Sequence, residues 1–187
     1  MKKFLTAIAL AASFAASAEI KIAIVDMADL LRLHPQYESD GRLLKETDRD
    51  YQDRLEKMQD DLKAIGEDGK KATEELQNPL LSAKAKLEAQ RKVESLQQRF
   101  IAGQQELRMK AAEFQGQLED MNARLLRTRS GEIREKIAVW AEEQGYDMVL
   151  DRSLIAYSKP EFDVTDEILK LYGVDPAKRQ ERKNEGK

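Results

Sequence analysis

The longest pattern in the chain is a narrow stripe of apolar or small residues within charged sequence, between residues 27 and 129. In its first half, the stripe positions are separated alternately by four and three residues. This two-in-seven spacing is typical of a helix that packs along a partner in a coiled coil. It therefore predicts one long helix, with stripe positions at Leu44, Asp48, Tyr51, Leu55, Met58, Leu62, Ile65, Gly69, Ala72 and Leu76.

The end of this first helix is predicted at Asn78-Pro79. The stripe keeps its phase through Gly66 and Gly69, which a loop of arbitrary length would not preserve. We interpret these glycines as weak points inside the helix, each costing about 1 kcal/mol against alanine. Proline lacks an amide hydrogen and disfavours helix in the preceding residue. The tip of the arm is therefore predicted near residues 77–81.

The main stripe resumes after Pro79, and this returning part of the stripe predicts a second long helix that runs back along the first. One step, from Leu107 to Ala111, is four where three is expected, which locally unwinds a coiled coil without ending it. The phase is lost at residues 128–131, and Ile133 begins a new stripe, so the packing partner of the helix is predicted to change there. The positions of the returning stripe are Ala89, Val93, Leu96, Phe100, Gly103, Leu107, Ala111, Phe114, Leu118, Met121, Leu125 and Thr128.

Equal lengths and opposite charges predict that the two helices form an antiparallel hairpin over residues 36–129. The stretches 27–77 and 80–129 would each be about 75 Å long at 1.5 Å per residue. Residues 37–77 carry 8 basic and 13 acidic side chains, whereas residues 80–129 carry 10 basic and 6 acidic ones. These opposite net charges favour the pairing, although exposed ion pairs contribute only a few tenths of a kcal/mol each.

The two ends of the chain are predicted to meet in a small β/α body made of residues 19–35 and 130–176. Residues 20–25 are predicted to form a strand, and residues 147–151 and 154–157 a hairpin of two strands. Because these few short elements form only a small hydrophobic core, the body is predicted to oligomerise. The predicted fold class is mostly α, with a long antiparallel coiled-coil hairpin projecting from a small β-stranded oligomerisation body. The residues predicted for this body include Ile22, Ile24, Val25, Val149, Leu150 and Ile155.

Helix boundary signals complete the body. Gly145 is predicted to end the long returning helix, because glycine is common just past a helix end. Asp163 or Thr165 is predicted to cap a final short helix. Residues 177–187 carry five basic and two acidic side chains, and this polar tail is predicted to be disordered.

Residues 1–18 have the composition of a cleavable export signal. Lys2 and Lys3 precede an apolar run that is too short to span a bilayer, and Ala16-Ser17-Ala18 has the small-x-small form of a cleavage site. The chain contains no cysteine, which suits a bacterial periplasm, where disulfides are permitted but not required. A periplasmic location is therefore expected.

The sequence offers no constellation of catalytic or metal-ligating residues. It has no cysteine, no glycine-rich phosphate loop and one histidine, His34, which is interpreted as a structural residue beside Pro35. Asp26, Asp147 and Asp151 flank strands, where aspartates usually cap or form turns. The net charge is −3, and no basic patch is interleaved with aromatic residues. The chain is therefore predicted not to be an enzyme, and to bind no cofactor, metal or nucleic acid.

The predicted signal, first strand, charged hairpin and closing strands together resemble the Skp/OmpH family of periplasmic chaperones of outer-membrane proteins. The more specific parts of the likeness are residues 21–27, 146–151, 156–157 and 163–169. The resemblance implies a homotrimer whose strands join in a barrel-like body with three projecting arms. It further implies that unfolded outer-membrane proteins are held in the cavity between the arms, without ATP.

A second, thinner apolar stripe is the candidate surface for contacts with such clients. An unfolded barrel strand exposes alternating apolar residues, so holding it needs many weak, adaptable contacts. A broadened hairpin interface explains the same stripe equally well, and the sequence leaves both interpretations open. The members of this second stripe are Leu87, Ile101, Met109, Ala112 and Leu126.

The acidic charge departs from the best-known members of that family, which are basic. It weakens any inference that the chain binds lipopolysaccharide or a membrane surface electrostatically. Basic residues gather only near the predicted tip and in the C-terminal tail. The competing interpretation is an exported coiled-coil spacer or adaptor of the cell envelope that binds no unfolded client.

Overall fold

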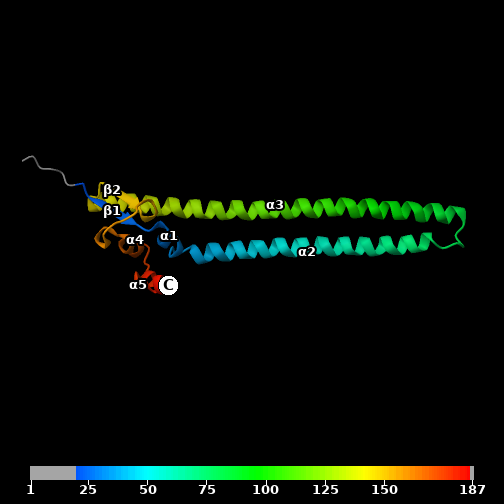
Figure 1. Cartoon of the computed structure of the whole chain (residues 1–187), viewed down its shortest axis with the longest axis horizontal. Helices are drawn as coiled ribbons and strands as arrows, with labels where there is room; N and C mark the ends of the chain where they lie inside the picture. The colour runs from blue at the N-terminus through cyan, green and yellow to red at the C-terminus, as the bar shows by residue number, and fades with distance from the viewer. Residues whose placement is uncertain (1–19, 186–187) are drawn as a thin grey trace, which may run out of the picture.

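The computed structural model describes residues 20–185 and shows a long helical hairpin projecting from a small body (Figure 1). This confirms the predicted fold class. The expected export signal lies outside the described residues. Within them, no helix is both long and apolar enough to cross a bilayer. In chain order the elements are β1 (Ile22–Val25), α1 (Met27–Arg32), α2 (Tyr37–Leu76), α3 (Ala83–Gln144), β2 (Met148–Asp151), the 3₁₀ turns η1 (Arg152–Leu154) and η2 (Pro160–Phe162), α4 (Thr165–Leu171) and α5 (Ala177–Glu185).

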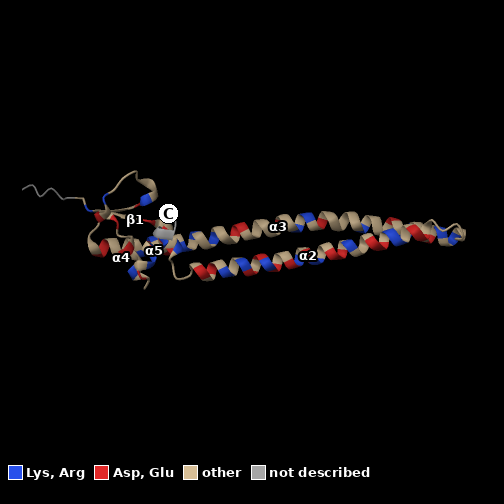
Figure 2. Ribbon diagram, turned by 60° about the horizontal axis from the view of Figure 1, so that its bottom comes forward, with Lys and Arg blue, Asp and Glu red and all other residues tan. Residues whose placement is uncertain are grey.

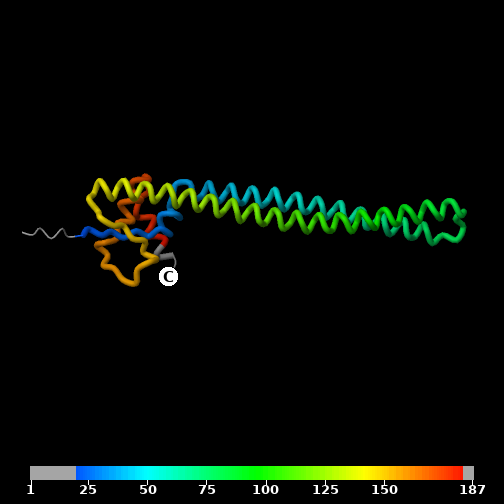
Figure 3. The backbone as a smooth tube through the Cα atoms, turned by 90° about the horizontal axis from the view of Figure 1, so that it is seen from above, coloured from blue at the N-terminus to red at the C-terminus, as the bar shows by residue number. Residues whose placement is uncertain are grey.

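The arm turns where the proline disfavours helix. Helix α2 ends at Leu76 and α3 begins at Ala83, on either side of Asn78-Pro79. The Asn78 Oδ1 atom accepts a hydrogen bond from the Leu80 N–H at 3.0 Å, and Ser82 caps α3 by accepting from the Ala85 N–H. Seen from above, α2 and α3 cross as they run to the tip (Figure 3), as expected for a coiled coil.

The main stripe forms the interface between α2 and α3. Leu62, Ala72 and Phe114 are buried, and most other stripe positions are partly buried. Leu62 fits against Gly103, because a Cβ atom at that glycine would lie 2.6 Å from the Leu62 Cδ2 atom. Tyr51 stacks on Phe114 with ring centroids 4.3 Å apart. The hairpin is therefore held together by one interlocked seam.

The irregular step in the returning stripe lies later than the sequence pattern predicts. Ala111 is exposed, whereas Lys110 is partly buried. The Lys110 ammonium lies 6.0 Å from the centre of the Phe114 ring, so the long aliphatic stem of this lysine can cover the seam while its charge stays in water. The four-residue step therefore falls between Phe114 and Leu118.

Helix α3 passes without interruption from the arm into the body, where its partner changes as predicted. Beyond residues 128–131, Ile133 and Ile137 are buried against other body elements. Gly145 ends the helix with φ of 69°. The core of the body consists of Ala23, Val25, Leu30, Ile133, Ile137, Val164, Ile168 and Leu169.

The predicted hairpin of residues 147–151 and 154–157 is wrong. Strand β2 instead pairs in parallel with β1, with Ile22 opposite Met148 and Val25 opposite Asp151. The long helices form the crossover that parallel strands require. After β2, the Asp151 carboxylate accepts a hydrogen bond from the Ser153 N–H, and the chain enters η1 instead of a second strand.

The C-terminal segment also differs from the expected disorder. Residues from Ala177 form helix α5, and Arg179 on this helix is only 5% exposed. Its guanidinium donates to Asp29 at 2.8 Å, to Asp163 at 2.9 Å and to Asp166 at 3.0 Å. One buried arginine thus attaches a polar segment to the body through three carboxylates.

Candidate functional site

The second stripe lies outside the hairpin interface of this chain. At 100° per residue, its five members fall within an arc of about 100° on one face of α3. Ala112 is also exposed. The interpretation as a broadened hairpin interface is therefore not supported. The larger side chains are about half exposed or more: Leu87 49%, Ile101 49%, Met109 65% and Leu126 45%.

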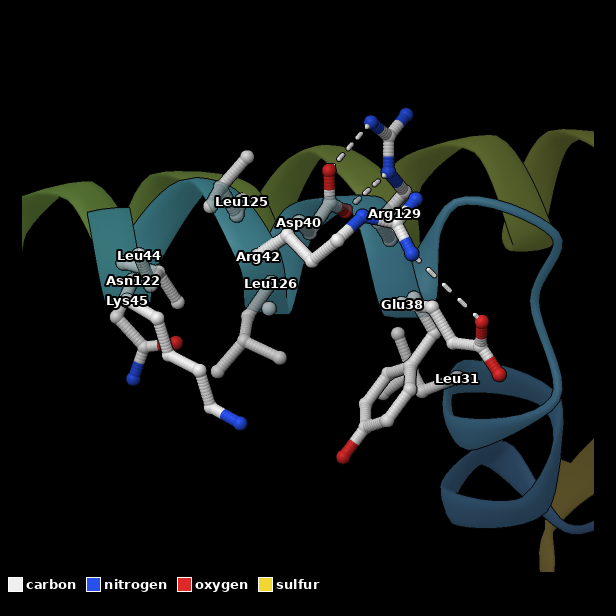
Figure 4. Close-up of a pocket in the computed structure, with 12 residues that line it drawn as sticks. Leu31, Glu38, Asp40, Arg42, Leu44, Lys45, Asn122, Leu125, Leu126 and Arg129 are labelled. Carbon is white, nitrogen blue, oxygen red and sulfur yellow. Dashed lines mark hydrogen bonds and ion pairs between the residues drawn. The ribbon is translucent and has the colours of Figure 1, made fainter. Parts of the chain in front are cut away.

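The stripe ends in a cavity at the root of the arm (Figure 4). The cavity has a volume of about 550 Å³. Helices α2 and α3 form most of its wall, and Leu31 of α1 adds to it. Leu44, Leu125 and Leu126 give it an apolar lining, and charged side chains of Arg42, Lys45 and Arg129 surround them.

Arg129 closes one side of this cavity and joins α3 to the start of α2. Its Nε and Nη2 atoms donate to the two carboxylate oxygens of Asp40 at 2.8 and 3.1 Å, and Nη1 donates to Glu132 at 2.9 Å. The hydrogen bonds from Arg129 lower the pKa of Asp40 despite partial burial. The Asp40–Arg129 pair therefore stays charged at neutral pH and fixes the root of the arm.

Basic and acidic residues recur along both helices of the arm (Figure 2). In the described part of the chain, ion pairs between α2 and α3 occur near the two ends, as Lys92 with Glu75 and Arg129 with Asp40. Other pairs, such as Arg54 with Asp50, lie within one helix. The opposite net charges of the helices thus contribute few direct contacts, and the charged surface is mainly solvated.

The residues proposed for the oligomerisation body divide between two faces of the β1–β2 sheet. Alternate side chains of a strand point to opposite faces. Val25 and Val149 pack against the core of their own chain. Ile22, Ile24 and Leu150 fall on the opposite face, where Ile24 is buried and the neighbouring Met148 is half exposed.

Exposed apolar side chains continue from this outer sheet face. Ile155 is partly buried, whereas its neighbours Leu154 and Tyr157 are 79% and 83% exposed. Sequence reasoning missed these two because it placed them in a strand. They are among the most exposed large apolar residues of the described chain, so this part of the body presents an uncovered apolar surface.

The Arg179 cluster was also missed by sequence reasoning. The available signal was Asp175-Pro176, because an aspartate followed by proline often begins a helix. The Asp175 carboxylate accepts a hydrogen bond from the Ala177 N–H at 2.9 Å. The expectation of disorder came from polar composition, which does not reveal that Arg179 meets aspartates from distant parts of the chain.

No metal centre is present among the described residues, because no three His, Cys, Asp or Glu side chains are grouped to hold an ion. The candidate functional surfaces are therefore the second stripe on α3, the cavity at the arm root and the outer face of the sheet. The second stripe and the exposed apolar residues beside the sheet suit contact with apolar polypeptide segments.

Comparisons with known proteins agree with this architecture. Chaperone protein Skp of Pectobacterium atrosepticum is 28% identical over 179 residues, covering 91% of this chain and 98% of that protein. Chaperone protein Skp of Yersinia enterocolitica is 27% identical over 173 residues, with the same coverage. Both are named as chaperones and not as enzymes.

The fold has a counterpart among solved structures. An OmpH-like protein of Caulobacter crescentus CB15 matches with a TM-score of 0.59 at 15% identity, covering 83% of this chain and 85% of that one. The model of the family described as outer membrane protein (OmpH-like) matches residues 21–172. Because this match takes in both helices of the arm and most of the body, the chain belongs to the OmpH-like outer membrane protein family.

Proposed function

We propose that this protein is an ATP-independent periplasmic holdase that binds unfolded outer-membrane proteins between the helical arms of a homotrimer. The family and the chaperone names of the relatives support a chaperone role for outer-membrane proteins. The observation that carries the proposal is the second stripe on α3, whose large side chains are about half exposed or more in the described part of the chain.

The stripe suits a client without fixed structure. Its side chains are spread along the arm instead of gathered in one deep pocket, so each contact with a client is weak. An unfolded barrel protein offers apolar residues at alternate positions along many strands. Several shallow contacts can therefore hold different clients, while the charged surface beside the stripe keeps the complex in solution.

Oligomerisation would bring several arms around one client. The outer face of the β1–β2 sheet carries partly buried Ile22 and Leu150 and half-exposed Met148, whereas Ile24 on the same face is already buried within the chain. Leu154 and Tyr157 extend this surface. Burying such a surface against other copies is favourable at about 25 cal/mol per Å² of apolar area. Capture by surface contacts alone needs no nucleotide, which supports ATP independence.

Dilution of a urea-denatured outer-membrane barrel protein tests the proposal directly. In the presence of the purified chain and without nucleotide, the barrel protein is expected to stay soluble and to co-elute with the chaperone in size-exclusion chromatography. Aggregation at the rate seen without the chain, together with no complex, would favour the spacer interpretation instead.

Paired serine substitutions test the role of the stripe. Leu87→Ser with Ile101→Ser is expected to weaken client capture severalfold while leaving thermal unfolding nearly unchanged, because both side chains are half exposed. Leu43→Ser with Leu80→Ser is the matched control, since it removes two exposed leucines outside the stripe. Equal loss of capture in both pairs would contradict a specific role for the α3 face.

A further inference from the structure

The only histidine of the chain occupies the junction between the body and the arm. His34 lies in the short break between α1, which ends at Arg32, and α2, which begins at Tyr37. Its side chain is 3% exposed, although the residue belongs to neither helix. A titratable ring is thus buried in the non-helical segment that joins α1 of the body to α2 of the arm.

The hydrogen bonding of His34 indicates which protonation state of the imidazole ring the folded chain accommodates. The Nδ1 atom accepts a hydrogen bond from the Gln36 backbone N–H at 3.3 Å, so this nitrogen carries no proton in the observed arrangement. Gln36 immediately precedes α2. The neutral ring, with its proton on Nε2, therefore anchors the first turn of that helix.

Other elements enclose the ring with mixed charges. From α3, the Glu132 carboxylate lies 3.8 Å from Nε2, and Arg129 and Lys136 are nearby cations. Asp40 approaches from α2. Tyr172, the residue that follows α4, places its ring edge-on to His34 with the ring centroids 4.8 Å apart. The Lys136 ammonium lies 4.5 Å from the centre of the Tyr172 ring.

We propose that His34 is an acid-sensitive latch at the root of the arm. The neutral ring holds the start of α2 against α3 and α4. Protonation adds a proton to Nδ1, which can then no longer accept the hydrogen bond from the Gln36 N–H. Two N–H donors face each other instead. The first turn of α2 then separates from the body, while α3, which is continuous into the body core, still carries the arm.

The direction of the pH effect follows from the surroundings of the ring. Burial lowers the pKa of His34, and Arg129 and Lys136 lower it further, against the opposing effects of Glu132 and Asp40. The folded state therefore takes up the proton less readily than the unfolded chain. Stability contributed by the latch is complete above the unfolded pKa of about 6.5 and is lost as the pH falls from there toward the folded pKa.

This pH range isolates His34 from other side chains. His34 is the single histidine and the chain has no cysteine. Hydrogen bonding lowers the pKa of Asp40, and hydrogen bonds from Thr165 and Arg179 lower the pKa of Asp163 despite its burial. Asp40 and Asp163 consequently remain charged between pH 7 and 5, so neither carboxylate causes a change at the arm root in this range.

Nuclear magnetic resonance of the full chain with isotope-labelled histidine measures the titration as one resolved curve. The midpoint is expected below the ordinary histidine value. Hydrogen exchange of residues 33–42, corrected for intrinsic rates, is expected to be about fivefold faster at pH 5 than at pH 7, as the loss of one net hydrogen bond implies. Exchange in the seam around Phe114 is expected to stay unchanged.

Two variants separate a latch from a merely structural histidine. His34→Asn keeps an acceptor near the Nδ1 position but does not titrate, so its exchange is expected to be independent of pH in this range. Glu132→Gln keeps the histidine and removes the adjacent negative charge, so the midpoint of the wild-type response is expected to move to lower pH.

Three results would overturn the proposal. They are an ordinary titration midpoint for His34, the same pH response in His34→Asn as in the wild type, and an unchanged midpoint in Glu132→Gln. If His34→Asn does not fold, the titration curve and the Glu132→Gln midpoint still decide between the alternatives, because both keep the native ring.

Discussion

At the residue scale, Arg129 and Arg179 join segments that are far apart in the sequence. Arg129 links α3 to Asp40 near the start of α2. Arg179 links α5 to Asp29 on α1 and to Asp163 before α4. Neither arginine belongs to the apolar stripes. Whether an arginine forms a buried ion pair depends on which distant carboxylate the fold brings next to it. These contacts therefore could not be predicted from local sequence.

Replacing Asp40 tests the clamp at the arm root. Asp40→Asn is expected to lower the free energy of unfolding by about 1–2 kcal/mol at pH 7, because it removes a charge-assisted pair with Arg129. The folded-state pKa of Asp40 is lowered. Its contribution is therefore present above the unfolded pKa, about 3.9, and is lost as the pH falls through the folded value.

Urea unfolding at neutral pH and at several values below 4 measures this effect. The wild type and Asp40→Asn are expected to converge at the acidic end. Asp48→Asn is the control, because Asp48 is an exposed carboxylate on the same helix. A difference between wild type and Asp40→Asn that persists at about pH 2 would show that charge is not the cause.

Replacing Arg179 tests the attachment of α5. Arg179→Met is expected to lower the free energy of unfolding of the body by about 3 kcal/mol, because partly buried Asp29 loses its cation and Asp163 keeps only Arg152. Limited proteolysis is expected to cleave α5 sooner. Arg182→Met changes an exposed arginine on the same helix, and an equally large loss in that control would assign the effect to net charge.

At the scale of the elements, the periodicity of apolar residues predicts the long helices and misses the strand pairing, which depends on a few contacts between distant segments. The main stripe predicts the two helices of the hairpin and the change of partner after residues 128–131, and Pro79 predicts the turn at Asn78-Pro79. The parallel pairing of β2 with β1 was missed, since a short apolar strand carries no signal for the direction of its neighbour. The second stripe was found by spacing, but its exposure required the packed helices.

Glycines in the arm provide a test of the packing. A Cβ atom at Gly69 meets nothing within 4 Å, whereas one at Gly103 lies 2.6 Å from buried Leu62. Gly69→Ala is therefore expected to stabilise the arm by about 1 kcal/mol through helix propensity. Gly103→Ala is expected to be less stable than Gly69→Ala by about 1–3 kcal/mol, because overpacking opposes the same gain.

Thermal unfolding followed by circular dichroism compares the two alanine variants. Gly116→Ala is the control in α3, because its Cβ also meets nothing within 4 Å. It is expected to behave like Gly69→Ala. Equal melting temperatures for Gly103→Ala and Gly116→Ala would mean that Leu62 moves aside without cost and that the seam is loosely packed at this point.

At the scale of the whole molecule, the small body has to support a far longer arm. Its two-stranded sheet is apolar on both faces. Ala23, Val25 and Val149 on one face contact the core of the chain, whereas the other face keeps Met148 half exposed beside partly buried Ile22 and Leu150. A two-stranded sheet is marginal unless more strands or another layer cover it. This supports assembly of several copies through the outer face.

Loss of Leu154 and Tyr157 tests this assembly. Each apolar side chain that is buried between copies contributes about 1.5–3 kcal/mol. Leu154→Ser with Tyr157→Ser should therefore cost about 3–6 kcal/mol per copy and weaken association at least a hundredfold. Light scattering at micromolar concentration is expected to give an oligomer for the wild type and a monomer for the double variant.

The helical circular dichroism signal distinguishes a variant that has only dissociated from one that has unfolded. Both side chains are more than three-quarters exposed in the single chain, so the dissociated variant is expected to keep the helicity of its arm. Leu43→Ser with Leu80→Ser, on the arm, is expected to leave the oligomer intact. A monomeric wild type would refute assembly, whereas a variant that stays oligomeric would place the interface elsewhere on the body. Because a lone arm cannot enclose a client, the monomeric variant is also expected to lose most of its capture of an unfolded barrel protein.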